Sequence, residues 1–410
     1  MIPRRRLTAA LVVAASLAGA GVPWVTRAAA TTDPARDKQW GLDHIGAPAA
    51  WTKSTGLGIT IGIVDTGVDL THEDLAGKIV GTADCRDSGG KASGCSQGPG
   101  LGQDDNGHGT HVAGIAAAIT GNGKGGAGTA PDARLLVVKA LDEDSGLAED
   151  INAGVKWAVD HGARVVNLSI SGGLAGSLFG SGSILTESIE YAWEHGSVVV
   201  LAAGNDNFLG LGGANYGDIP AVIVGAAGHD GKMTSYSSPL GNARWAILAP
   251  GGSSSSDATK KIHSSYWRSG KTNQYAELHG TSMAAPYVSG TLALLMARGL
   301  TAQAAVNTML STADDSVSCG GAQYCVGRLD AAAALATLPA LPPPTTATTA
   351  APATTTTTTT TPTTVPAGGT GSDGPGLSVG NTDPGYLVAD VNGGVRAFGA
   401  TPFSGQLTQT

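Results

Sequence analysis

The sequence predicts an α/β domain built on a mainly parallel sheet with helices on both faces. Between residues 40 and 338, short unbroken runs of aliphatic and β-branched residues alternate with helical patterns. Such runs are typical of parallel strands that are buried on both sides, and their alternation with helices favours a sheet covered on both faces. Functional side chains are then expected at the carboxyl ends of the strands.

Five buried strands are expected from these runs. They are residues 58–65, 134–141, 164–170, 197–203 and 221–227. Helices are expected to begin near His108, Gly146, Ser183 and Thr281. The first three helices each follow a strand, as the connections between parallel strands require.

The composition excludes several classes of protein. Charged residues make up 14% of the chain, against roughly 25% in an average soluble domain, so neither a coiled coil nor a polybasic binder is expected. The formal net charge is −8, which makes a nucleic-acid backbone an unsuitable partner. Hydrophobic residues reach 41%, enough for a sizeable core.

The chain begins with the pattern of an export signal peptide, residues 1–30. Arginines at positions 4–6 precede an apolar stretch, and three alanines at positions 28–30 follow it. The alternative is an N-terminal membrane anchor, but the alanines stand where a signal peptidase would cut. We therefore expect a protein that is secreted or associated with the cell surface.

The rest of the chain divides into three parts. Residues 31–338 form the α/β domain, and residues 339–370 are a linker rich in Thr and Pro that cannot bury a core. Residues 371–410 contain a hairpin signal around Asn392-Gly393-Gly394. We expect the start of an incomplete β repeat there, which is a candidate contact with a cell surface or a polymer.

Three residues of the domain have the chemistry of nucleophilic catalysis. Asp65 ends a strand in GIVDTGVD, His108 begins a helix in DDNGHGTHVAGIAAAI, and Ser282 stands at the start of a helix in HGTSMAAPYVSG. An imidazole can take the hydroxyl proton while a carboxylate orients the imidazole. The helix N-terminus at Ser282 would favour developing negative charge.

With these three motifs, and with NLSISGG at 167–173 and LAAGN at 201–205, the chain resembles the subtilisin-like serine peptidases. The order Asp, His, Ser is the order found in subtilisin. The resemblance implies a serine endopeptidase that acts through an acyl-enzyme. It also implies that Asn205 and the backbone N–H of Ser282 form the oxyanion hole.

The resemblance further implies which residues contact the substrate: Ser169, Ile170, Ser171, Gly172, Gly213 and Ala214. The last two would stand at the base of the pocket for the residue before the scissile bond. They are small and neutral, so we expect broad cleavage with a preference for large uncharged residues. Asp206 and Asp218 are the nearest acids, and neither is well placed to bind Lys or Arg. An extra loop at residues 82–102 is the alternative source of selectivity.

The resemblance also implies a structural calcium site, with Asp74 and Asn122 as ligands beside backbone oxygens. Calcium prefers such oxygen ligands. The alternative is a loop closed by its own hydrogen bonds. Of the other histidines, His111 is expected to pack, His72 to support the loop of the acid, and His279 to be a structural neighbour of Ser282.

The four cysteines predict two disulfides in an exported chain, for which three pairings exist. We expect the two local pairings, because each then closes its own loop. These are Cys85 with Cys95 and Cys319 with Cys325.

Two functional readings remain from the sequence. One is an active endopeptidase, expected to be a monomer with proteins or peptides as substrates. The other is a binding or scaffolding protein on a decayed peptidase fold. Intact Asp65, His108, Asn205 and Ser282 favour the enzyme. A processing role and a degradative role both stay open. Residues 31–39 are too few for a folded prosegment, so we expect folding without one.

Overall fold

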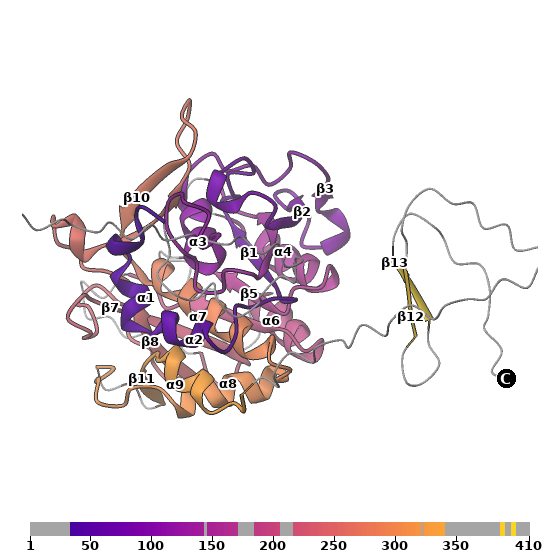
Figure 1. Ribbon diagram of the computed structural model, residues 1–410. Helices are drawn as coiled ribbons and strands as arrows, with labels where there is room; N and C mark the ends of the chain where they lie inside the picture. The colour runs from indigo at the N-terminus through magenta and orange to yellow at the C-terminus, as the bar shows by residue number, and fades with distance from the viewer. Residues whose placement is uncertain are drawn as a thin grey trace, which may run out of the picture. The chain divides into compact units, whose positions relative to one another are not determined.

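A computed structural model describes residues 33–142, 146–170, 184–205, 216–320, 322, 324–340, 386–389 and 395–398. The chain divides into two units, Met1–Pro343 and Pro344–Thr410, and the first contains the sheet and the helices (Figure 1). The predicted signal peptide and nearly all of the predicted linker lie outside the described residues. No helix within the described ranges is long and apolar enough to cross a membrane.

Nine strands of the described residues form one sheet in the order β11-β8-β7-β6-β5-β1-β4-β2-β3. Neighbouring strands are parallel, except that β3 runs antiparallel to β2. Their bounds are β1 Thr60–Asp65, β2 Ile79–Asp84, β3 Ser96–Gln97, β4 Arg134–Lys139, β5 Val165–Leu168, β6 Val198–Ala202, β7 Ala221–Ala227, β8 Trp245–Pro250 and β11 Cys325–Arg328.

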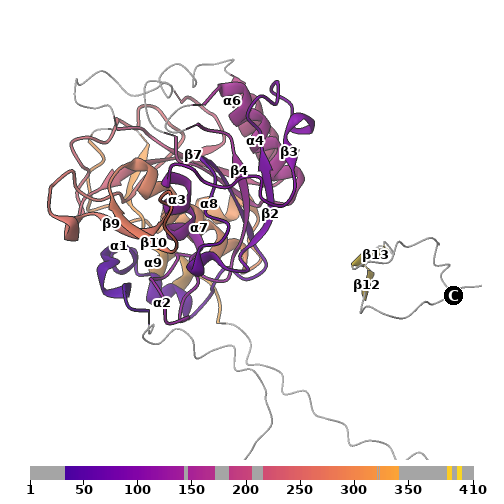
Figure 2. The ribbon, with the colours of Figure 1, turned by 90° about the horizontal axis from the view of Figure 1, so that it is seen from above.

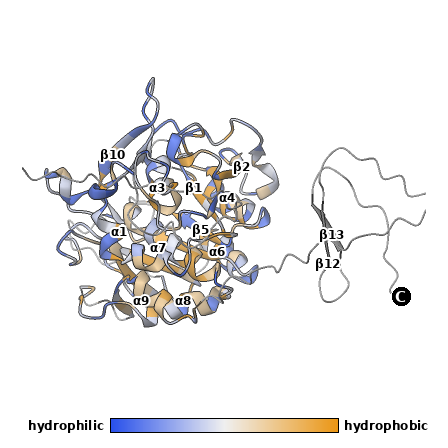
Figure 3. Cartoon of the chain, in the orientation of Figure 1, coloured by the Kyte–Doolittle hydropathy of each residue, from blue (hydrophilic) through white to orange (hydrophobic). Residues whose placement is uncertain are grey.

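Hydrophobic layers cover both faces of this sheet. Along β1, Ile61 and Ile63 belong to one core and Val64 belongs to the other, because successive side chains point to opposite faces. Both cores therefore require the continuous apolar runs from which the strands are predicted. Figure 3 shows hydrophobic residues along the interior strands and hydrophilic ones on the hairpin that carries β10 (Gln274–Leu278).

The helices divide between the two faces. One core contains residues of α3 and α7, and the other contains residues of α4 and α6, which pack side by side (Figure 2). The longer helices are α3 His108–Ala117, α4 Ala148–Asp160, α6 Ile184–Glu194, α7 Thr281–Met296 and α8 Ala302–Ser311. The shorter ones are α1 Trp40–His44, α2 Ala47–Trp51 and α9 Ala331–Ala336.

The sequence prediction of the fold class is confirmed. Each of the five expected strands contains one of β1, β4, β5, β6 and β7, and the four expected helices begin within two residues of their predicted starts. The other strands of the sheet were not predicted. Among these, β2 has a mixed burial pattern near the edge of the sheet, so it lacks a continuous apolar run.

A two-stranded hairpin, β9 Ile262–Tyr266 with β10 Gln274–Leu278, packs on α3. His111 of α3 joins the two strands, since its Nε2 lies 3.1 Å from the carbonyl oxygen of Ile262 and 3.0 Å from that of Ala276. In return, Ser264 Oγ donates to the carbonyl oxygen of His111 at 2.8 Å. His111 thus packs as expected, and its burial lowers its pKa to about 3.

The two disulfides join Cys85 to Cys95 and Cys319 to Cys325. These are the local pairings expected from the sequence. The first closes part of the extra loop, which is held against α4 because Ser88 donates from both its N–H and its Oγ to Asp150 Oδ1, at 3.1 and 3.0 Å. The loop is therefore anchored to the sheet face that α4 covers.

In the second unit, the described residues are the two strands of a hairpin. Strand β12 Tyr386–Ala389 pairs antiparallel with β13 Val395–Phe398, with Tyr386 opposite Phe398 and Ala389 opposite Val395. The predicted turn at Asn392-Gly393-Gly394 lies outside the described residues. The proposed contact with a surface or polymer stays a prediction.

The buried His111 predicts a specific loss of stability in acid. Its pKa is about 3 in the folded protein and about 6.5 in an unfolded chain. The unfolded state therefore binds the extra proton between these pH values, so stability falls as the pH falls through this window. Between pH 7 and pH 5 we expect His111 to account for a loss of about 2 kcal/mol.

The measurement is urea denaturation of the protein and of His111→Gln at several pH values. Glutamine keeps an N–H donor for the two carbonyls but does not titrate. Between pH 7 and pH 5, the free energy of unfolding of the variant should fall by about 2 kcal/mol less than that of the parent protein. Equal slopes in the two proteins would contradict the assignment.

Candidate active site

The predicted site residues meet at the carboxyl edge of the sheet. Asp65 is the last residue of β1, Ser169 follows β5 and Asn205 follows β6, and these strands are neighbours in the order β6-β5-β1. Helices α3 and α7 begin at His108 and Thr281 and pack against each other. The topology thus gathers residues that lie far apart in the sequence.

Asp65 and His108 form a direct hydrogen bond. His108 Nδ1 lies 2.7 Å from Asp65 Oδ1, and the carboxylate is fully buried whereas the imidazole is 21% exposed. The backbone N–H of Thr66 donates to the same carboxylate oxygen at 2.8 Å. Because the carboxylate accepts from Nδ1, the imidazole proton lies on that nitrogen, and Nε2 is the basic one.

Glycine is required where α3 begins. Gly107 has a φ of 108°, and a Cβ at this position would lie 2.5 Å from the ring of Tyr266 and 2.6 Å from the carbonyl oxygen of Trp267. The β9–β10 hairpin therefore approaches the residue next to His108 as closely as a bare backbone allows. Any larger residue would displace the hairpin or the imidazole.

Ser282 lies in the first turn of α7 and contacts Ser169 twice. Ser169 Oγ donates to the carbonyl oxygen of Ser282 at 2.8 Å, and Ser282 Oγ donates to that of Ser169 at 3.3 Å. The second bond is long, so the hydroxyl gives up little energy when it turns to another acceptor. Ser282 is 2% exposed.

Asn205 is oriented by the residue before Ser282. Its Oδ1 accepts from the backbone N–H and from the hydroxyl of Thr281, at 2.9 and 3.1 Å. The amide therefore presents Nδ2 as its donor end. Gly280, with a φ of 148°, permits this approach, because a Cβ there would lie 3.3 Å from Asn205 Nδ2.

The expected substrate-contacting residues are described only in part. Ser169 and Ile170 are buried at the end of β5. The other four, Ser171, Gly172, Gly213 and Ala214, lie outside the described residues, as does Asp206. Asp218 is exposed. The apolar pocket predicted from the sequence therefore stays a prediction.

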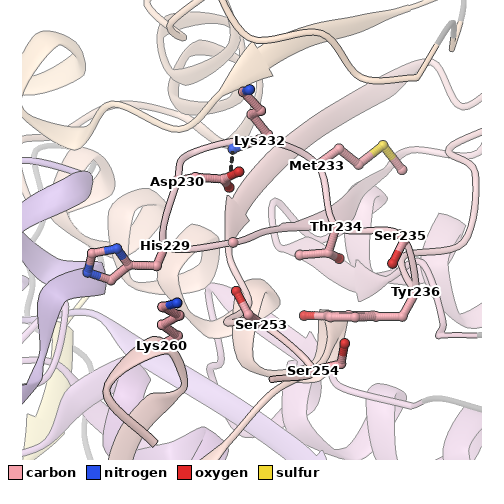
Figure 4. Close-up of a pocket in the computed structure, with 11 residues that line it drawn as sticks. His229, Asp230, Lys232, Met233, Thr234, Ser235, Tyr236, Ser253, Ser254 and Lys260 are labelled. Carbon is pink, nitrogen blue, oxygen red and sulfur yellow. Dashed lines mark hydrogen bonds between the residues drawn. The ribbon is translucent and has the colours of Figure 1, made fainter. Parts of the chain in front are cut away.

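A different pocket borders the site at the ends of β7 and β8. It has a volume of about 370 Å³ and is lined by residues that include His229, Lys260, Ser253 and Tyr236 (Figure 4). The ring of Tyr236 packs edge-on against His279, three residues before Ser282, with 5.3 Å between ring centroids. Hydroxyl and charged side chains make this pocket polar, unlike the apolar substrate pocket expected from the sequence.

Two other histidines hold structural positions. His72 is fully buried, and its Nε2 lies 2.9 Å from the carbonyl oxygen of Gln274. Its Nδ1 accepts from the backbone N–H of Asp74 at 3.2 Å. His279 is exposed as a whole, and partial desolvation of its imidazole lowers its pKa.

Asp74 and Asn122, the expected calcium ligands, contact each other. Asn122 Nδ2 donates to Asp74 Oδ1 at 3.0 Å, and the backbone N–H of Gly126 donates to Asp74 Oδ2 at 3.1 Å. Burial raises the pKa of Asp74. Gly125 is required here, because a Cβ on it would lie 1.9 Å from Asp74 Oδ2.

A second carboxylate at this loop was missed by the sequence analysis. Asp33 accepts from the backbone N–H groups of Gly121 and Gly123 at 2.6 and 3.0 Å. It lies 88 residues before the first of them in the sequence, so no local pattern connects the two. Asp33, Asp74 and Asn122 bring side-chain oxygens to this loop, and in the structure these oxygens accept N–H groups of residues 121–126. This is the hydrogen-bonded loop that the sequence left open as the alternative to a calcium site. Among the described residues, no group of three or more His, Cys, Asp or Glu side chains could hold a metal ion.

Comparison with known proteins identifies the family. The subtilase family model matches residues 56–339. Thermitase from Thermoactinomyces vulgaris is 38% identical over 295 residues, which cover 72% of this chain and 94% of thermitase. Subtilisin DY from Bacillus licheniformis is 35% identical over 266 residues, which cover 63% of this chain and 84% of that protein.

Solved structures agree with the family match. A protease from Pseudoalteromonas arctica shares 30% identity with a TM-score of 0.62, covering 75% of this chain and 99% of that one. Fervidolysin from Fervidobacterium pennivorans, a keratinolytic enzyme related to subtilisin, shares 28% identity with a TM-score of 0.60, covering 74% of this chain and 46% of that one. The chain therefore belongs to the subtilase family and is a subtilisin-like serine endopeptidase.

Proposed function

We propose that this endopeptidase is exported and cleaves peptide bonds with Asp65, His108 and Ser282 as its triad and Asn205 in its oxyanion hole. The observation that supports this most is the 2.7 Å bond between Asp65 and His108 at the sheet edge where Ser282 also lies. Active protein in culture fluid with its N-terminus near Thr31 would support export and cleavage after Ala30.

The proposed reaction has two halves. His108 Nε2 takes the proton of Ser282 Oγ as that oxygen bonds to the scissile carbonyl carbon, and the carbonyl oxygen becomes an oxyanion. The same imidazole then gives the proton to the leaving amine, the C–N bond breaks, and an acyl-enzyme remains. Water attacks the ester by the same proton transfers in reverse order and frees Ser282.

Charge stabilisation in this reaction comes from oriented donors. Asn205 Oδ1 is bonded to Thr281, so Nδ2 is the end that would donate to the oxyanion. The backbone N–H of Ser282 lies in the first turn of α7 and would be the second donor. Donors held in place before the reaction need no reorganisation when charge develops. The buried Asp65 would stabilise the imidazolium that forms in both halves.

Removal of the nucleophile or of the oxyanion donor tests this proposal. Ser282→Ala should abolish hydrolysis of a peptide substrate and labelling by a fluorophosphonate. Asn205→Ala should lower kcat by about 10²–10³, the loss found for an oxyanion-hole donor of subtilisin rather than a value derived for this chain. KM should change little. Full activity in Ser282→Ala, or labelling of another residue, would refute the triad.

We further propose that the substrate pocket prefers large uncharged residues before the scissile bond. The support is the neutral pair Gly213 and Ala214 in the sequence, since a buried Lys or Arg without a partner is costly. Matched peptides with Leu, Phe or Arg at that position test it by kcat/KM. A tenfold preference for Arg would contradict the proposal and direct attention to Asp206 and Asp218.

We also propose that calcium binds at the loop of residues 121–126, between the side chains of Asp33, Asp74 and Asn122. Their oxygens would hold the ion, and bound calcium would offset the charge of the buried Asp74. A ligand at about 100 times its Kd adds about 2.7 kcal/mol to the free energy of unfolding. A chelator should then lower the melting temperature by roughly 4 °C.

The measurement uses Ser282→Ala protein, which removes self-digestion, with and without chelator. The additional Asp74→Asn variant should melt at the lower temperature expected for the calcium-free protein, both with and without chelator. Asp150→Asn is the matched control, because Asp150 is also a buried carboxylate but lies on α4. Its response to chelator should equal that of the parent. A melting temperature that no chelator changes would favour the loop closed by its own hydrogen bonds.

A further inference from the structure

Behind Asp65 and His108 lies a buried polar network centred on Thr66. Besides its backbone N–H bond to Asp65, Thr66 Oγ1 donates to Asp104 Oδ1 at 2.9 Å and accepts from the backbone N–H of Gly109 at 3.0 Å. Thr66 is 1% exposed. One residue thus contacts both the acid on β1 and the first turn of the helix that carries the base.

Asp104 binds that same helix turn with both carboxylate oxygens. Oδ1 accepts from the backbone N–H of Gly107 at 3.0 Å, and Oδ2 accepts from the N–H of Thr110 at 3.0 Å and from its hydroxyl. Gly107, the N-cap residue of α3, has no side chain to cap the helix. Asp104, at 1% exposure, therefore caps α3 from outside it.

Lys139 holds the opposite side of Thr66. It ends β4 directly opposite Asp65 in the sheet, and its Nζ donates to the carbonyl oxygen of Thr66 at 2.7 Å. The same Nζ pairs with Asp105 Oδ1 at 2.7 Å, and the Lys139 side chain is only 4% exposed. A buried cation and a buried anion thus lie on two sides of one threonine.

We propose that Asp104, Thr66 and Lys139 are positioning residues that fix Asp65 against His108 and set the basicity of His108 with opposite signs. The proposal rests on the proposed function of His108 as the base. His108 begins α3, where the helix dipole disfavours an imidazolium. The negative charge of Asp104 offsets that field, and the positive charge of Lys139 adds to it.

Other titratable or charged groups on the elements packed against α3 are unchanged in the variants below. They are Asp65 on β1, Glu73 and Asp74 in the turn Glu73–Leu75, Arg134 on β4, His263 on β9 with its partner Glu277 on β10, and His111 on α3 itself. Differences between variants therefore report the substituted charge, and for Lys139→Gln they also include the charge of Asp105, which loses its ion-pair partner. Both changes act on the His108 pKa in the same direction.

The experiment measures the pKa of the His108 imidazole by NMR titration in the Ser282→Ala background, with His108→Gln to assign its signal. Asp104→Asn should lower this pKa and Lys139→Gln should raise it, each by roughly half a unit. Lys139→Arg, which keeps the charge, should return the value to that of the parent. Shifts in the same direction, or none, would overturn the proposal.

Kinetics with Ser282 present give the second readout. Asp104→Asn should lower kcat by between about tenfold and 10²-fold with little change in KM, because misplacing the base affects the chemical step. The apparent pKa on the acid side of the pH profile of kcat/KM should shift in the same direction as the His108 pKa measured by NMR. Thr66→Val leaves every charge in place, so it should lower kcat without moving that limb.

The matched control is Asp150→Asn, which also removes a buried carboxylate that accepts from a serine N–H and hydroxyl near a helix start. It should lose stability without changing the His108 pKa or kcat. If Asp104→Asn behaves like this control, the network is only structural and the proposal fails. The NMR result stands without peptidase activity, so an inactive parent would refute the proposed function and leave this test intact.

Discussion

The bond between His108 and Asp65 is the interaction on which the rest of the site depends. It joins the end of a buried strand to the start of a helix across 43 residues of sequence. A carboxylate with no exposed surface is costly unless hydrogen bonds and nearby charge compensate it. Here the imidazole and the N–H of Thr66 both bind Oδ1, whereas Oδ2 is buried without a hydrogen-bond partner among the described residues. The bond also holds the proton on Nδ1, so the position of one carboxylate determines which nitrogen of His108 is basic.

Two helix N-termini meet at this edge, and their electrostatic effects differ. The start of α7 favours the negative charge that would develop beside Ser282, whereas the start of α3 disfavours a protonated His108. Two buried acids offset the unfavourable effect of the α3 dipole on a protonated His108. Asp65 contacts the imidazole directly, and Asp104 caps the first turn of α3. Both helices begin after a glycine with positive φ. A Cβ at Gly107 would overlap the ring of Tyr266, and a Cβ at Gly280 would lie in tight contact with Asn205.

Residues far from the site in the sequence hold its elements in place. His111 binds both strands of the β9–β10 hairpin, which in turn closes over Gly107. A few residues beyond the end of α3, the loop at residues 121–126 is held by Asp33 and Asp74. Helix α3, which carries His108, is thus held by contacts at its N-terminus, along its side and just beyond its C-terminus. The geometry of the proposed triad therefore depends on several packed elements rather than on the three motifs alone.

The sequence by itself predicted five of the buried parallel strands and indicated Asp65, His108, Asn205 and Ser282 as the candidate catalytic residues. Strands covered on both faces need unbroken apolar runs, and the proposed catalytic residues stand in short motifs, so both signals are local. Tertiary structure alone decided which distant groups meet. His111 reaches carbonyls 151 and 165 residues away, Asp33 reaches a loop 88 residues away, and Asp104 finds Thr66 across 38 residues. No periodicity in the chain encodes such contacts, because they depend on how helices and loops pack over the sheet once its strands have assembled.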